Sequence, residues 1–273
     1  MPDGEQLPEG VKRIAVAVEY DGSSFCGWQR QTHSPSVQAE IEAAFTTVAN
    51  HPITVSCAGR TDTGVHGTNQ IIHFDTASER GSRNWLLGAN ANLPFDIRVH
   101  WVEEKSAQFH ARFSATARTY RYLIANQPQR PAIFHHGLTW EKKLLNETLM
   151  NLAAQQLLGE HDFSSFRAAG CQSRSPNRNI YKVDVWRQGE LVILEIVANA
   201  FLHHMVRNIT GSLISIGCGE RPVDWLSELL KKRDRTQAPA TAPANGLYLV
   251  QVNYPDHFNM PGFTPGPQLI CRV

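Results

Sequence analysis

Apolar and polar residues alternate along residues 12–20, and this period of two predicts a β-strand. Beyond a glycine-rich turn, Ile41 and Phe45 lie four residues apart on the apolar face of a predicted helix, which opens at Ser34-Pro35. These two elements begin a β-α-β-β-α-β order. Its other members are predicted strands over residues 53–58, 69–75 and 96–103 and a short helix over residues 83–91.

The second half of the chain repeats this order without sequence similarity. Residues 116–124 alternate as a strand, and residues 142–158 are predicted as a helix with Leu145, Leu149 and Leu152 facing inward. Two such sets predict an α+β fold of two ferredoxin-like domains with antiparallel sheets, an arrangement that RNA-recognition modules also use. The other predicted elements are strands over residues 179–186 and 190–199, paired across Gln188-Gly189, helices over 204–217 and 224–232, and a closing strand over 247–253.

The predicted linker between the domains lies near residues 104–114. We therefore assign residues 1–108 to an N-terminal domain and residues 109–273 to a C-terminal domain. A tail from Pro255 onward carries four prolines, and we expect it to be irregular or disordered.

The composition is that of a globular protein of 273 residues, with 42% hydrophobic and 19% charged residues. A run of about 18 apolar residues, as a membrane-spanning helix needs, does not occur. The first residues lack the basic and apolar stretches of a signal peptide. The five cysteines lie at least 31 residues apart, which argues against a CxxC zinc or redox pair and favours reduced thiols. These features predict a cytoplasmic protein.

The formal net charge is only +1, but the cations are unevenly distributed. Residues 105–130 contain five Lys or Arg and no acid, and residues 167–187 contain five against Asp184 alone. A third basic cluster occupies residues 231–235. Clustered cations suit a surface that binds nucleic-acid phosphates, although charge runs are also common on solvated faces. Charge alone leaves both interpretations open.

The most unusual stretch is Gly-Arg-Thr-Asp-Thr-Gly-Val-His-Gly at residues 59–67. Its GxxxxG spacing resembles a phosphate-binding P-loop, but Val65 and His66 stand where that loop needs Lys and Ser or Thr. What remains is Asp62 beside Arg60 in a glycine-rich loop between two predicted strands. Glycines let a backbone pass close to a ligand, although an Asp-Thr-Gly taken alone is most often a solvated turn.

In its wider setting, this stretch resembles the active-site motif of the tRNA pseudouridine synthase A family. The agreement runs in order over roughly residues 12–255. It includes Tyr20-Asp21-Gly22, Gly27-Trp28-Gln29, Ser36 to Glu40, Leu93-Pro94, Phe109 to Ala115, Arg118, Tyr120 to Tyr122, His161 to Phe166, Cys171 to Ser173, Met205 to Ile209 and Gly246 to Leu249.

The resemblance implies an isomerase that needs no metal and no cofactor. It breaks the N1–C1′ bond of a uridine, rotates the base and joins C5 to C1′. Asp62 takes the position of the family's reactive aspartate. Tyr120 takes that of the tyrosine that stacks on the uracil, and Arg207 that of the arginine paired with the aspartate. Arg60 aligns with the residue that fills the space left by the flipped base.

The resemblance also implies the partners. These are uridines 38, 39 and 40 in the anticodon stem-loop of tRNA, held in a central RNA-binding cleft formed by the two sheets, and a second copy of the chain in a homodimer. The segments that align with RNA-contacting stretches coincide with two basic clusters. They consist of Phe109, His110, Ala111, Arg112, Phe113, Gly170, Cys171, Gln172, Ser173 and Arg174.

Several alternatives remain open at this point. Asp62 either attacks C1′ or C6 or acts as a base at C2′, and Tyr120 in its alternating strand is also a candidate core residue. A non-catalytic RNA-binding module would share the basic clusters and the fold. A metal-dependent hydrolase would use the His135-His136 and His203-His204 pairs and lose activity with a chelator, but these pairs lack ligands at metal-site spacing.

Overall fold

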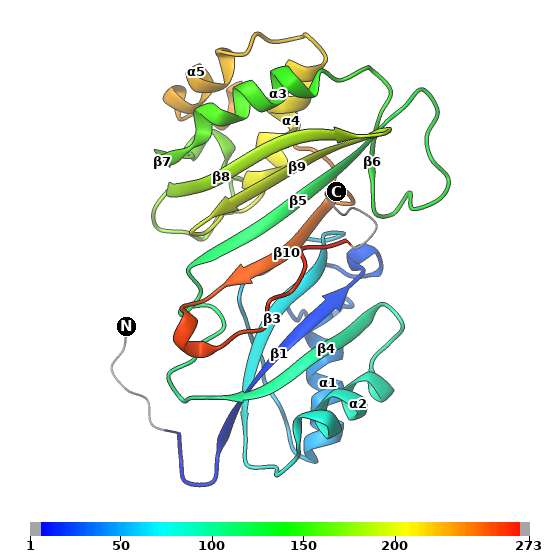
Figure 1. The fold of residues 1–273 in the computed structure, drawn as a ribbon, viewed down its shortest axis with the longest axis vertical. Coiled ribbons are helices and arrows are strands. Elements are labelled where there is room, and N and C mark those ends of the chain that lie inside the picture. Colours follow the sequence, from blue (N-terminus) through cyan, green and yellow to red (C-terminus); the bar gives the residue numbers. More distant parts are fainter. Residues whose placement is uncertain (1–6, 268–273) are drawn as a thin grey trace. The chain divides into compact units, whose positions relative to one another are not determined.

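The computed structural model describes residues 7–267, which form two compact units (Figure 1). The first comprises the chain up to Thr116 and again from Leu249 onward, and the second comprises Ala117–Tyr248. Both units are α+β, with mostly antiparallel strands, as the sequence predicts.

The first unit is a sheet with two helices packed against it. Its strand order is β4-β1-β3-β10, with β2 beside β3, and β1 runs antiparallel to both β3 and β4. The two helices contribute Phe45 and Trp85 to a core in which Phe74 of the sheet contacts both rings. The elements are β1 (Lys12–Tyr20), η1 (Gly22–Ser24), α1 (Val37–Ala49), β2 (Ser56–Cys57), β3 (His66–Thr76), α2 (Ser82–Asn92), β4 (Ile97–Lys105), β10 (Leu247–Asn253, which enters this unit at Leu249) and η5 (Asp256–Phe258).

The second unit has the strand order β5-β9-β8-β7, and the short β6 runs parallel to β5. The predicted hairpin is confirmed, because Gln188 pairs with Leu191 and Gly189 adopts a positive φ in the turn. Its elements are β5 (Ala117–Asn126), β6 (Thr139–Glu141), α3 (Glu147–Ala154), η2 (Gln155–Leu157), β7 (Gly159–Asp162), η3 (Ser164–Phe166), β8 (Asn177–Gln188), β9 (Leu191–Ala198), α4 (Met205–Gly217), α5 (Trp225–Lys232) and η4 (Arg235–Gln237).

The helix predicted over residues 142–158 is shorter, and its buried face was predicted wrongly. The Asn146 side chain accepts the Leu149 N–H and caps α3, so residues 142–146 lie outside the helix. Leu149 and Leu152 are 37% and 57% exposed, whereas Met150, Ala153 and Ala154 are buried. The leucine pattern gave the wrong face because Leu145, its first member, does not belong to the helix. It lies in the loop before α3 and is buried there.

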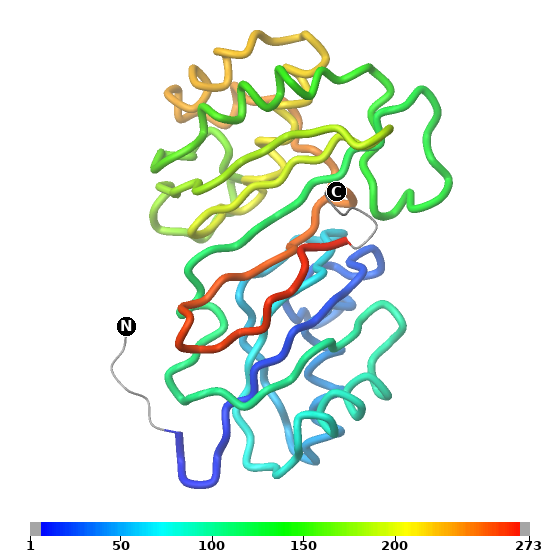
Figure 2. Tube along the Cα trace, viewed as in Figure 1, coloured from blue at the N-terminus to red at the C-terminus, as the bar shows by residue number. Residues whose placement is uncertain are grey.

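The unit boundaries differ from the predicted division at residues 108 and 109. Thr116 N–H donates to the Asn253 carbonyl, and the Phe109 ring packs against Tyr254 and Phe258 at 5.1 and 5.3 Å. Residues 109–116 and 249–267 therefore belong to the first unit (Figure 2). The tail is irregular as predicted, but it is packed rather than disordered, since Phe258 is buried. Residues 268–273 of the predicted tail lie outside the described residues.

Among the described residues, no helix combines the length and apolar character that crossing a bilayer requires. Four described cysteines, at positions 26, 57, 171 and 218, are free thiols.

Candidate active site and RNA-binding segments

Asp62 lies in the loop of residues 58–65 that joins β2 to β3. Val65 N–H donates to the Asp62 carbonyl at 3.1 Å and closes a tight turn, in which Gly64 has a φ of 75°. Thr61 and Val65 are buried, Arg60 is exposed and Asp62 is half-buried between them. The loop is thus anchored on both sides of the carboxylate while Arg60 extends to solvent.

The segment of residues 20–28 supports this loop from one side. Trp28 N–H donates to the Thr61 carbonyl at 3.0 Å, and the Tyr20 and Thr61 hydroxyls lie 2.9 Å apart. Gly27 has a φ of 92°, and a Cβ there would lie 2.9 Å from the Thr61 oxygen. A Cβ at Gly22 would overlap the Val65 carbonyl. The two glycines therefore allow the two backbones to touch next to the carboxylate.

A second set of contacts joins the loop to β3. The Gln70 side chain donates to the Gly59 carbonyl at 2.6 Å, and Ala58 N–H donates to the Ile71 carbonyl. Burial raises the pKa of the neighbouring Cys57 thiol to about 11, so this group stays protonated at neutral pH. Asp62 is therefore a better candidate nucleophile than the Cys57 thiol at the end of β2.

The loop's far end carries a buried His66 that faces Asp21. The Asp21 carboxylate lies 3.1 Å from His66 Nδ1. This contact, together with hydrogen bonds from Ser23, holds the pKa of Asp21 well below its usual range despite partial burial. Asp21 is thus a fixed anion that braces the turn.

The first predicted RNA-binding segment, residues 109–113, follows β4 in the first unit. Phe109 and Ala111 are fully buried, whereas Arg112 and Phe113 are exposed. The Arg112 guanidinium lies over the Phe113 ring, 5.6 Å from its centroid. The side chains that this turn offers to a ligand are therefore mainly a cation and an aromatic face.

The second predicted RNA-binding segment, residues 170–174, lies in the second unit between η3 and β8. Its Gly170, Gln172 and Arg174 are exposed, and Cys171 and Ser173 are half-buried. Arg167 was not predicted as a site residue, but it shapes this loop by donating to the Cys171 and Ser173 carbonyls at 2.8 and 2.7 Å.

Cys171 has an unusual environment within that loop. Its sulfur accepts the His203 N–H at 3.4 Å. Burial raises the pKa of the Cys171 thiol, but hydrogen bonds from His203, Ser173 and Arg167 outweigh it, and the net pKa is lowered.

Tyr120 and Arg207 both belong to the second unit. Tyr120 lies on β5, is 8% exposed and meets Phe201 edge to face at 5.0 Å. Arg207 is in the first turn of α4, and its Nε donates to the Ala242 carbonyl at 2.8 Å. The helix begins after His204, which has a φ of 61°. Both side chains are held by neighbours within their own unit.

The family model described as tRNA pseudouridine synthase matches residues 16–114 and 153–255. The chain therefore belongs to a class of RNA-modifying isomerases, the tRNA pseudouridine synthase family.

Individual relatives match along nearly their whole length. The tRNA pseudouridine synthase A of Shewanella denitrificans is 58% identical over 93% of this chain and 98% of its own. That of Klebsiella pneumoniae strain 342 is 55% identical over 99% of this chain and 100% of its own. A chain in the structure of a Cbf5-Nop10-Gar1 complex superposes with a TM-score of 0.37 at 10% identity, over 86% of this chain and 48% of its own.

Proposed function

We propose that this protein isomerises uridine to pseudouridine in tRNA, with Asp62 as the reactive carboxylate. The observation that supports this most directly is the half-buried Asp62 on a loop fixed by backbone contacts from residues 20–28 and from β3. A carboxylate held in this way can attack the sugar or the base, or take a sugar proton, without first reorganising.

We also propose the substrate positions, the oligomeric state and the location of the enzyme. The substrates are uridines 38, 39 and 40 of the anticodon stem-loop, and the enzyme is a cytoplasmic homodimer. Tyr120 stacks on the uracil and helps remove the C5 proton, and Arg207 keeps Asp62 ionised. The N1–C1′ bond breaks and a C5–C1′ bond forms, and the proton lost from C5 is balanced by one gained at N1, so no atom is lost overall. The resemblance of the sequence around Tyr120 and Arg207 to that of the family supports these roles, and Arg207 also lies within the residues that the family model matches.

A ferredoxin-like arrangement of each unit is part of the proposal. In the first unit, the order β4-β1-β3 with β2 beside β3 follows that arrangement, and α1 and α2 occupy its two helix positions. In the second unit, β5, α3, β8, β9 and α4 follow one another in the corresponding order.

The function is tested with an unmodified tRNA transcript and the purified protein. Pseudouridine mapped by carbodiimide probing is expected at positions 38, 39 or 40. Modification at other positions would overturn the assignment of the substrate. Tight tRNA binding without any modification would instead favour a non-catalytic RNA-binding module.

Removing only the hydroxyl of Tyr120 separates stacking from proton transfer. We expect Tyr120→Phe to keep tRNA affinity but to lower the single-turnover rate about a hundredfold, as loss of a general base does. Tyr120→Ala should weaken engagement of the flipped base in addition, since stacking contributes about 1–3 kcal/mol per base. A wild-type rate for the phenylalanine variant would limit the residue to positioning the uracil.

Arg60 and Arg112, two exposed arginines of the first unit, should respond differently to substitution. Arg112→Ala should raise KM and reduce the slope of log affinity against log salt by roughly one, as loss of one phosphate contact does. Arg60→Ala should leave that slope unchanged and lower kcat about tenfold or more, because its contribution comes after docking, when the base leaves the stack.

Arg83→Ala provides the matched control for both, since Arg83 is an exposed cation of the same unit outside the candidate segments. Arg83→Ala should change neither the salt dependence of binding nor kcat. A wild-type kcat for Arg60→Ala would make Arg60 an ordinary phosphate contact and remove its role in base flipping.

A further inference from the structure

The turn that follows β4 is held by side chains from distant parts of the first unit. It exposes Arg112 and Phe113, and Phe113 is 64% exposed although it is a large apolar residue. Besides hydrogen bonds within the turn, contacts from β1, β3 and the segment after β10 hold its backbone. The buried residues around it show how its backbone is fixed.

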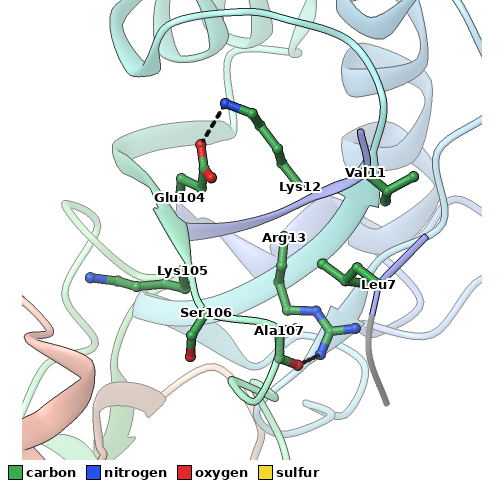
Figure 3. Close-up of a pocket in the computed structure, with 8 residues that line it drawn as sticks. All are labelled: Leu7, Val11, Lys12, Arg13, Glu104, Lys105, Ser106 and Ala107. Carbon is green, nitrogen blue, oxygen red and sulfur yellow. Dashed lines mark hydrogen bonds and ion pairs between the residues drawn. The ribbon is translucent and has the colours of Figure 1, made fainter. Parts of the chain in front are cut away.

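Arg13 of β1 fixes the chain just before the turn. Its Nε and Nη2 make two 2.7 Å bonds to the Asp75 carboxylate of β3. Its Nη1 donates to the carbonyls of Ala107 and Phe109 at 2.7 and 2.8 Å. Figure 3 shows the bond from the Arg13 guanidinium to the Ala107 carbonyl. A bidentate arginine is a rigid anchor, so the turn starts from a fixed point.

His73 of β3 fixes the centre of the turn. It is 5% exposed, and its Nδ1 accepts the Ala111 N–H at 3.1 Å. Burial, with repulsion from His110 and Arg13 outweighing attraction from Asp75, lowers the pKa of His73 to about 3. The imidazole is therefore neutral at physiological pH, and in its Nε2–H tautomer Nδ1 accepts the Ala111 N–H.

The other side of Ala111 is bound by the C-terminal segment. The Tyr254 hydroxyl donates to the Ala111 carbonyl at 2.7 Å. Ala111 is fully buried, so both of its backbone polar groups rely on side chains, one from β3 and one from the segment after β10. Buried backbone groups need such partners, and losing one leaves an unpaired polar group.

His110 forms hydrogen bonds inside the turn itself. Its Nδ1 accepts the N–H groups of Arg112 and Phe113 at 3.1 and 3.2 Å, and its ring lies 4.6 Å from that of His73. The two imidazoles thus fix three consecutive N–H groups, and these include the amides of both exposed residues.

We infer that His73 and Tyr254 are positioning residues for RNA binding, which hold Ala111 so that Arg112 meets a backbone phosphate and Phe113 a base. The inference rests on the proposed function. An aromatic face next to a fixed cation is the combination that binds unpaired nucleotides. His73 acts through the turn and touches no substrate.

The test compares His73→Leu, which removes the acceptor, with His73→Asn, whose Oδ1 lies as many bonds from Cα as Nδ1 does. His73→Leu should raise the Kd for tRNA about tenfold, as expected when the Ala111 N–H is left unpaired. It should leave kcat within about twofold. His73→Asn should restore most of the affinity. Tyr254→Phe should weaken binding about threefold, and the control Tyr181→Phe, on an exposed tyrosine of β8, should change nothing.

The decisive measurement repeats His73→Leu in an Arg112→Ala, Phe113→Ala background. If His73 acts only through these side chains, it has no further effect on Kd there. An equal loss in both backgrounds, or a His73→Asn protein as weak as His73→Leu, would overturn the inference. Because Kd is measured without turnover, a wild-type protein that binds tRNA but makes no pseudouridine would defeat the proposed function alone.

Discussion

Asp62→Asn is expected to abolish pseudouridine formation while tRNA still binds with near wild-type affinity. The substitution keeps the size and planar shape of the side chain, but it removes the charge and replaces one acceptor oxygen of the carboxylate by an NH2 donor. The loop should keep its form, because contacts of Thr61, Val65 and Gly59 anchor it. Single-turnover assays should show less than about one-hundredth of the wild-type rate, given the factors typical of essential catalytic groups.

Asp256→Asn is the matched control, since Asp256 is an exposed aspartate of the same unit. Its rate and its tRNA affinity should both be those of the wild type. If Asp62→Asn retained more than a few hundredths of the activity, the reactive group would have to be sought elsewhere.

Gly27→Ala should lower kcat about a hundredfold with little change in tRNA affinity. Gly27 has a φ of 92°, and the new Cβ would lie 2.9 Å from the Thr61 oxygen and 3.2 Å from the Asp62 carbonyl carbon. To relieve this overlap, the loop must move away from residues 20–28 and carry the carboxylate with it. A displacement of about 1 Å at a reacting group can cost a factor of 10².

The control is Gly262→Ala, where a Cβ meets nothing within 4 Å. Thermal unfolding of both variants separates displacement from unfolding, because Gly27→Ala should lower Tm by only a few degrees. A Gly27→Ala enzyme with wild-type kcat would show that the loop does not depend on this contact.

Local sequence patterns predicted most elements of the fold. Strand β1, helix α4 and the β8–β9 hairpin lie close to their predicted bounds, because their periodicity and turn chemistry are local. The buried face of α3 was predicted wrongly because the leucine pattern begins at Leu145, before the N-cap residue Asn146. The unit boundary was missed because contacts such as that of Phe109 with Phe258 join residues far apart in sequence.

In the candidate site, too, local patterns were predictable and contacts between distant residues were not. Asp62 stands out in sequence because its glycine-rich loop has a distinctive motif. The contacts of Gly27 with Thr61 and of His73 with Ala111 join residues 34 and 38 positions apart, and no short-range pattern marks them. The motif therefore pointed to Asp62 as the candidate reactive group, and only the three-dimensional structure identified the residues that hold its loop.

The return of the chain to the first unit after residue 248 constrains the order of events during synthesis. The second unit is an insertion within the first, so a ribosome that has made residues 1–248 has produced a complete second unit and an incomplete first one. Tyr254, which bonds Ala111, emerges among the last residues. Although domains generally fold in order from the N-terminus, the unit that carries Asp62 must finish second. A chain terminated before Tyr254 would thus have a complete second unit but would lack the hydroxyl that bonds the Ala111 carbonyl.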